Sequence, residues 1–112
     1  MTQSAHGRCH CGAVQLSVPR LPADVTECHC SICRRYGALW AYYKVKEVSF
    51  TGPTELYVWG RKYIAFHRCA KCGCVVAWTP RGDYPECAVN ARMLEGLNLE
   101  IVRVIVEEDA SG

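Results

Sequence analysis

Nine cysteines in a chain of 112 residues limit the folds open to this protein more than any other feature of its sequence. A chain of this length forms one domain with a modest core, in which metal ions or disulfides can supply much of the stability. We therefore expect residues 1–112 to form a single domain built around these thiols. Only Cys87 stands alone, and the other eight form three clusters: Cys9 and Cys11; Cys28, Cys30 and Cys33; Cys69, Cys72 and Cys74.

The setting of these cysteines favours metal binding over disulfides. The first residues, MTQSAHGRCHCGAV, contain no basic segment followed by an apolar one, and no run of about 18 apolar residues occurs anywhere. We therefore expect a cytoplasmic protein without membrane segments. Thiols stay reduced in the cytoplasm, where clustered cysteines usually bind metal or act in catalysis.

The formal net charge of +2 gives little support for nucleic-acid binding. Lysines and arginines are scattered among acidic residues and form no basic stripe. If seven cysteines bound two zinc ions as thiolates, the charge would become +2 − 7 + 4 = −1. We therefore expect no nucleic-acid partner.

Short segments of alternating apolar residues predict a mostly β fold. They are rich in β-branched and aromatic residues and are bounded by glycine, proline or cysteine. The segments are 13–18 (AVQLSV), 46–50 (KEVSF), 55–59 (ELYVW), 62–66 (KYIAF), 74–78 (CVVAW) and 99–106 (LEIVRVIV), and TGPT at 51–54 predicts a turn. Two short helical turns are expected, at 31–38, where Ser31 can cap and Gly37 can end the turn, and at 91–96.

The third cluster contains a zinc knuckle, Cys69-Ala-Lys-Cys72-Gly73. Such a turn points both sulfurs toward one ion, and its glycine accepts the left-handed conformation that ends the turn. A knuckle supplies only half of a four-thiolate site, so the other two ligands must be remote. Cys9 and Cys11 are a natural second pair, and joining the two pairs would close a loop of about 60 residues.

That pairing leaves Cys28, Cys30 and Cys33 together, one ligand short of a closed zinc site. The spacing alone permits other arrangements, because Cys28 and Cys30 could instead join the knuckle. The second site could also be closed by any of four other residues: Cys74, Cys87, His29 or His67. Spacing therefore predicts two zinc ions but does not assign their ligands.

Four segments resemble the glutathione-dependent formaldehyde-activating enzyme family, which also includes the centromere protein V domain. These are GRCHCGAVQL, CHCSICRRYGA, the FTG at 50–52 and HRCAKCGCVV, in this order between about residues 7 and 94. The resemblance implies a single zinc-binding domain over residues 1–112, made of tandem coiled antiparallel sheets with one or two short helical turns. That fold is shared with a Rab-accessory zinc protein and with methionine sulfoxide reductase B.

The resemblance also implies a division of the cysteines between two zinc ions. Cys9, Cys11, Cys69 and Cys72 would hold a structural zinc, and the triplet would hold a catalytic one: Cys28, Cys30 and Cys33. The implied activity is that of a carbon–sulfur lyase that handles a thiol adduct such as S-hydroxymethylglutathione, made from glutathione and formaldehyde. A catalytic zinc keeps one position open, and three thiolates suit it to a soft sulfur ligand.

Glutathione carries two carboxylates, so its pocket should offer a cationic side chain. Arg34 and Arg35 directly follow the last cysteine of the triplet and are the candidates for binding the substrate. Three aromatic residues could form an apolar wall, although aromatics in strands more often belong to the core: Tyr36, Trp40 and Trp59. His10 and His29 lie between ligand cysteines, and we expect them to support the sites without binding metal.

A second hypothesis is a zinc-stabilised β module that binds a protein partner and has no activity. It predicts that both ions are fully coordinated by the protein, with Cys74 or Cys87 completing the second site. The sequence predicts neither the true substrate nor the oligomeric state.

Overall fold

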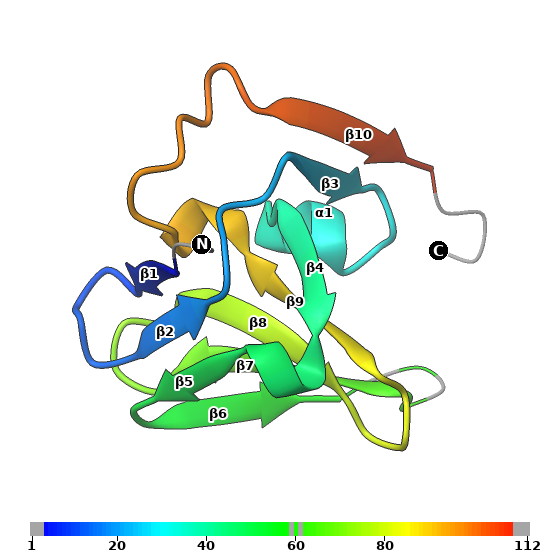
Figure 1. Cartoon of the computed structure of the whole chain (residues 1–112). Coiled ribbons are helices and arrows are strands. Elements are labelled where there is room, and N and C mark those ends of the chain that lie inside the picture. The colour runs from blue at the N-terminus through cyan, green and yellow to red at the C-terminus, as the bar shows by residue number, and fades with distance from the viewer. Residues whose placement is uncertain (1–3, 59, 61, 109–112) are drawn as a thin grey trace.

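The protein is built of ten short β-strands, and its computed structural model describes residues 4–58, 60 and 62–108 (Figure 1). The strands are β1 (Ala5–Arg8), β2 (Gln15–Val18), β3 (Asp24–Cys28), β4 (Trp40–Lys44), β5 (Ser49–Thr51), β6 (Thr54–Tyr57), β7 (Ile64–Cys69), β8 (Val75–Pro80), β9 (Glu86–Asn90) and β10 (Arg103–Glu107). One α-helical turn, α1 (Cys33–Tyr36), and two 3₁₀ turns, η1 (Val45–Glu47) and η2 (Ala91–Met93), complete the fold. The prediction of a mostly β protein with short helical turns is confirmed.

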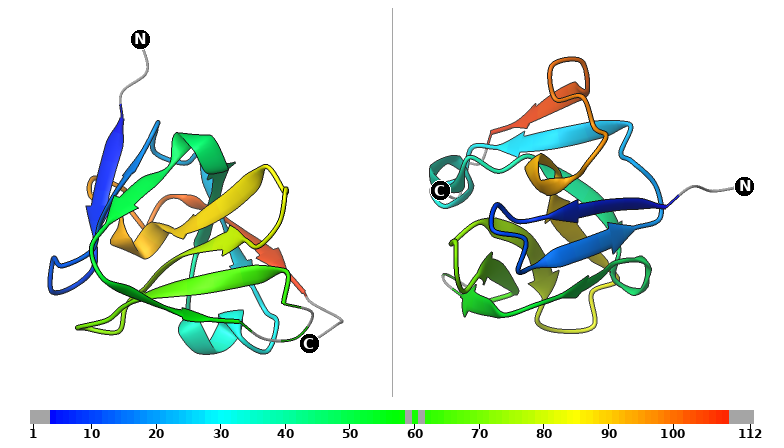
Figure 2. Two further views of the ribbon diagram at one scale, coloured as in Figure 1. Left: turned by 90° about the horizontal axis from the view of Figure 1, so that it is seen from below. Right: turned by 90° about the vertical axis from the view of Figure 1, so that its left-hand side faces the viewer.

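The strands form two sheets. One has three strands in the order β1-β2-β5, and the other has seven in the order β10-β3-β4-β9-β8-β7-β6. All pairs are antiparallel except β10 with β3, which run parallel. The expectation of antiparallel sheets is therefore wrong for the last strand, because a crossover returns the chain beside β3 in the same direction. Figures 1 and 2 show β10 on the outer side of β3.

The main core lies between the two sheets. The alternation in AVQLSV is confirmed, because Val14, Leu16 and Val18 are all buried and their neighbour Gln15 is exposed. They pack with valines and alanines of the large sheet. A second, smaller cluster of buried residues lies at the triplet cysteines: Cys33, Ala38, Trp40, Phe66 and Ala88. The triplet is thus anchored on its own small core.

The α1 turn begins in a different way from the one predicted. Ser31 does not cap it; the N-cap residue is Ile32 and makes no side-chain cap bond. The Cys30 sulfur instead accepts from the N–H of Cys33 at 3.3 Å, so a cysteine sulfur takes the place of a serine hydroxyl. The predicted end is confirmed, since Gly37 is left-handed and its N–H donates to the carbonyl of Cys33.

The predicted turn at TGPT is confirmed between β5 and β6. Gly52 has a φ of +108°, and a Cβ atom there would lie 2.1 Å from the carbonyl oxygen of Ala13. Only glycine fits this position, because a side chain would meet backbone that cannot move aside. Gly52 thus holds the β5–β6 turn against the segment that leads into β2. Within the residues that the structure describes, no helix is long and apolar enough to cross a membrane.

Candidate functional site

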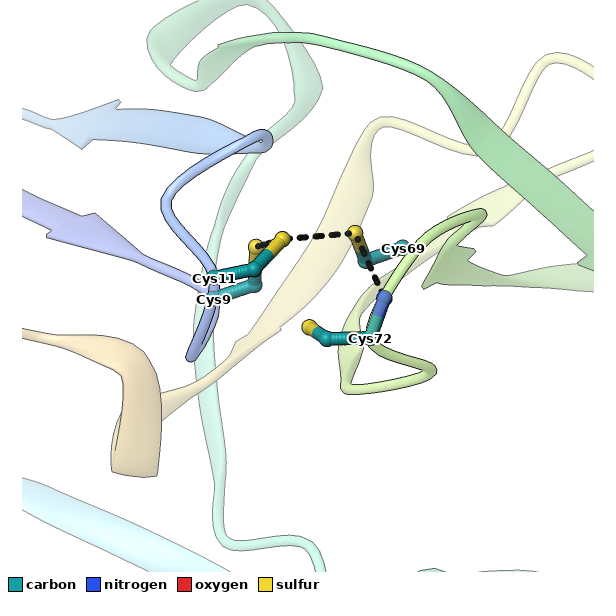
Figure 3. A group of neighbouring side chains, drawn as sticks. All are labelled: Cys9, Cys11, Cys69 and Cys72. Carbon is teal, nitrogen blue, oxygen red and sulfur yellow. Dashed lines mark hydrogen bonds between the residues drawn. The ribbon is translucent and has the colours of Figure 1, made fainter.

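Four cysteines from the two predicted pairs come together in space. The sulfurs of Cys9, Cys11, Cys69 and Cys72, here called the tetrad, all lie within 4.8 Å of one another. Figure 3 shows them converging from two sides, the first pair from the turn after β1 and the second from the turn between β7 and β8. The Cys11 sulfur lies 3.7 Å from those of Cys9 and Cys69. Four converging thiols are the donor set of a closed zinc site.

Backbone N–H groups favour the thiolate form of two of the tetrad sulfurs, those of Cys69 and Cys72. Cys69 Sγ accepts from the N–H groups of Lys71 and Cys72 at 3.3 and 3.4 Å. The Cys72 N–H lowers the pKa of Cys69, and the Cys74 N–H lowers the pKa of Cys72 to about 5. Because the thiolate is the form that binds zinc, these residues fit a zinc ion.

The triplet Cys28, Cys30 and Cys33 forms a second group, also with its sulfurs within 4.8 Å of one another. Cys28 ends β3 and Cys33 begins α1, so the turn between these elements brings the three thiols together. Among the described residues this group has three members, and neither Cys74 nor Cys87 belongs to it. The two groups match the division that the family resemblance implies and not the alternative in which Cys28 and Cys30 join the knuckle.

Two hydrogen-bond donors are directed at the triplet sulfurs. The indole N–H of Trp40 donates to Cys33 Sγ at 3.3 Å, and the Cys33 N–H donates to Cys30 Sγ. Burial raises the pKa of Cys33. Burial also acts to raise the pKa of Cys30, but the N–H groups of Cys33 and Ile32 outweigh it and lower that pKa. The thiols are soft donors already turned toward one point, and the residues therefore fit a zinc ion with three protein ligands.

A small cavity of about 160 Å³ lies against the triplet. Cys28 and Cys33 form part of its wall, and the guanidinium-bearing residues Arg34 and Arg92 form another part. The Arg92 Nε donates to the carbonyl oxygen of Gly37 at 2.7 Å, which fixes this side chain beside the cavity. The cavity wall thus combines thiols and guanidinium groups with the Glu27 carboxylate and the His29 ring, which bond to each other.

The two arginines singled out by the sequence lie in different places. Arg34 lines the cavity, whereas Arg35 is not among the lining residues and its Nη1 donates to the carbonyl of Ser31 at 2.7 Å. Sequence reasoning did not select Arg92, which is 55 positions from the Gly37 it bonds. The sequence did predict the element that carries Arg92, since this residue lies in the second expected helical turn, which is confirmed as η2.

The histidines take no part in either thiol group. His29 bonds to two carboxylates, with Nε2 2.6 Å from Glu27 Oε2 and Nδ1 3.1 Å from Glu108 Oε2. The hydrogen bond to Glu27 is the main cause that raises the pKa of His29. His67 bonds to Thr79 Oγ1 through Nε2 at 2.8 Å, and burial lowers its pKa. His10 is exposed.

The aromatic residues considered for the pocket wall, and the cysteines outside the two thiol groups, belong largely to the core. Trp40 is 1% exposed, and Tyr36 packs edge-on against Phe66, both within the cluster at the triplet. Trp59 lies outside the described residues. Cys87 is 2% exposed, and burial raises its pKa to about 11, which makes it a poor nucleophile. Cys74 lies beside the tetrad, where a cavity is shared with Cys9.

Asn90 is one of two buried polar side chains among the described residues. Its side-chain amide makes three hydrogen bonds. Its Oδ1 accepts from the N–H groups of Leu39 and Arg92, at 3.3 and 3.2 Å. Its Nδ2 donates to the carbonyl of Val75 at 2.9 Å. The side chain therefore ties two residues of the cavity wall to the start of β8.

Comparison with known proteins identifies the family. The sequence model of the glutathione-dependent formaldehyde-activating enzyme matches residues 4–103. The fold is similar to the crystal structure of a Rhodobacter sphaeroides protein, a structural genomics target, with a TM-score of 0.79 and 32% sequence identity over 93% of this chain and 99% of that one. No curated protein matches the chain. The family match spans most of the sequence and both thiol groups, and the chain belongs to the glutathione-dependent formaldehyde-activating enzyme family.

Proposed function

We propose that this chain, as one domain over residues 1–112, is a zinc-dependent carbon–sulfur lyase that makes and cleaves S-hydroxymethylglutathione or a similar thiol adduct. Two zinc ions are proposed, a structural one in the tetrad and a catalytic one in the triplet. The observation that carries the proposal is the cavity beside the triplet, because a group of three thiols with open space next to it can receive a substrate sulfur. The proposed location is the cytoplasm, where reduced thiols are abundant.

A zinc ion held by three thiolates leaves one position for a soft sulfur ligand and favours the thiolate form of a substrate thiol. The reaction forms one C–S bond and one O–H bond and breaks the S–H bond and the π bond of the carbonyl. The substrate sulfur attacks the carbon of formaldehyde, and the carbonyl oxygen takes up the proton that the thiol gives away. Cleavage of the adduct reverses the same step. The protein accelerates the reaction by holding the two reactants in the right orientation, so that they need not meet by chance in solution.

The arginines of the cavity supply binding and orientation. A guanidinium binds a carboxylate with two parallel hydrogen bonds, and Arg34 and Arg92 both lie on the cavity wall. Arg92 is held through Nε by Gly37, so its two terminal nitrogens stay available for a carboxylate. We expect a carboxylate of the substrate to lie between these side chains while its sulfur faces Cys28 and Cys33.

Titration calorimetry of the zinc-loaded protein with glutathione tests binding. We expect Arg92→Ala to weaken binding about 10-fold or more, because it removes a charged hydrogen-bonding partner. Arg35→Ala is the matched control and should leave the affinity unchanged, since its guanidinium is turned to the Ser31 carbonyl. Absence of any glutathione binding, or equal losses in the two variants, would contradict the proposed substrate site.

X-ray absorption of the zinc-loaded protein without substrate tests the coordination. Seven sulfur ligands over two ions, with one oxygen or nitrogen, are expected if the triplet keeps an open position. Eight sulfurs would mean that a further cysteine closes the second site. That result would favour the non-catalytic module, which binds a protein partner in place of a small thiol.

A further inference from the structure

Strand β10 is an edge strand of the seven-stranded sheet. It pairs only with β3 among the described residues, and it ends the strand order. Its three central residues are apolar and exposed, with Val104 and Ile105 each 40% and Val106 51% exposed. Edge strands are often protected by charged side chains, a proline or a bulge, and in RVIVE the charges stand only at the two ends, at Arg103 and Glu107.

The hydrogen-bonding groups of β10 divide between its two sides. The carbonyl of Glu107 accepts from the His29 N–H at 2.8 Å, so Glu107 faces β3. In a strand, successive residues direct their backbone groups to opposite sides. Arg103 and Ile105 therefore also face β3, while Val104 and Val106 direct their N–H and C=O groups outward. These outward groups are arranged to pair with another strand.

The sequence of β10 is complementary to itself. If a second copy of β10 lies antiparallel with Ile105 opposite Ile105, Val104 lies opposite Val106 and Arg103 lies opposite Glu107. Val104 and Val106 are then the hydrogen-bonded pair, which matches the direction of their backbone groups. The two ends of the strand meet as ion pairs of opposite charge, and the centre is apolar.

We propose that the protein forms a two-fold symmetric dimer in which β10 pairs with β10 of a second copy, centred on Ile105. The two seven-stranded sheets become one continuous sheet across the axis. A symmetric interface requires a self-complementary surface, and β10 meets this requirement in backbone direction, apolar character and charge. The proposal does not depend on the proposed enzymatic function.

The opposite edge of the same sheet lacks this complementarity. Strand β6 carries one charged residue, Glu55, which is paired with Arg68 of the neighbouring β7 at 3.0 Å. Pairing β6 with itself would place Glu55 opposite a neutral side chain or opposite another Glu55, in any register. We therefore assign the self-association to β10 and not to β6.

Sedimentation velocity of the zinc-loaded full-length protein, between about 1 μM and about 1 mM, tests the proposal. We expect a concentration-dependent dimer. Arg103→Glu and Glu107→Arg should each weaken it about tenfold or more, because the symmetry axis makes one substitution act at two pairs. The double variant R103E/E107R should restore it. Lys46→Glu is the matched control, since it makes the same charge change at an exposed residue of η1 and should have no effect.

Val106→Pro provides an independent variant, because it removes an outward N–H and leaves the hydrogen bonds to β3 in place. It should abolish the dimer while the circular dichroism spectrum stays unchanged. Three outcomes would overturn the proposal. These are a monomer at every concentration, which would leave β10 open to an extended peptide of another protein; a dimer that tolerates R103E and V106P; and a double variant that stays monomeric.

Discussion

If both thiol groups hold zinc as proposed, replacing Trp40 by phenylalanine should weaken zinc binding at the triplet and leave the tetrad unaffected. The Trp40 indole N–H donates to Cys33 Sγ at 3.3 Å, and the side chain is 1% exposed, so water cannot replace the lost donor. Donors of this kind fix the orientation of a metal ligand and disperse its charge. The substitution keeps an aromatic ring in the small core and removes only the N–H and part of the ring system.

The expected loss follows from the charge of the acceptor. A hydrogen bond to a charged group contributes about 1.5–3 kcal/mol, which corresponds to about 10- to 100-fold in zinc affinity. The same range is typical of supporting residues around metal sites. The smaller ring also leaves unfilled volume, which would lower the free energy of unfolding by roughly 1–3 kcal/mol.

Trp78→Phe separates these two effects. Trp78 packs against the same cluster as Trp40, but no hydrogen bond from it to a sulfur is found in the described residues. Competition with a chromogenic zinc chelator would measure both sites in each variant. We expect one of the two zinc ions in W40F to be bound about 10- to 100-fold more weakly than in the unaltered protein. W78F should bind both ions as the unaltered protein does. Equal affinities in the two variants, or an equal loss at both zinc sites, would refute the role assigned to the indole N–H.

Two further substitutions test the fold and the tetrad. Gly52→Ala should lower the free energy of unfolding by about 2 kcal/mol or more in urea titration, because its Cβ would lie 2.1 Å from the Ala13 oxygen in a left-handed conformation. Gly82→Ala, with no atom near its Cβ, should cost less than about 0.5 kcal/mol, and similar losses in both would argue against the close approach. Cys11→Ser should release one zinc equivalent and lower Tm by about 10 °C or more. Cys87→Ser should keep both ions by mass spectrometry, and a C11S protein that also keeps both would exclude Cys11 as a ligand.

The alternating segments predicted β2, β5, β6, β7, β8 and β10 and missed β1, β3, β4 and β9. Strand β2 was clear because Leu16 and Val18 alternate with polar neighbours. Strand β9 was missed because its inner residues are all buried, from Cys87 to Asn90, and periodicity carries no information when both faces are covered. The last strand was predicted, but its parallel pairing depends on the path of the chain and not on local sequence.

The thiol groups could be predicted better than the cavity beside them. Cysteine spacing predicted two zinc ions without assigning their ligands, and the family resemblance divided the cysteines into the two groups that the structure shows. Arg92 could not be assigned to the cavity from spacing, because its position depends on a hydrogen bond from η2 to Gly37, 55 positions earlier at the end of α1. Arg34 and Arg35 are adjacent in sequence, and only the direction of the short helical turn decides which of them reaches the cavity.

The three hydrogen bonds of Asn90 connect residues near the triplet with a residue near the tetrad. On one side the amide holds Leu39 and Arg92 of the cavity wall, and on the other it holds Val75, where β8 leaves the tetrad knuckle. The amide therefore links the cavity wall directly to the strand that follows the tetrad knuckle. If the tetrad holds zinc as proposed, that ion would help to order a cavity whose lining contains no tetrad residue.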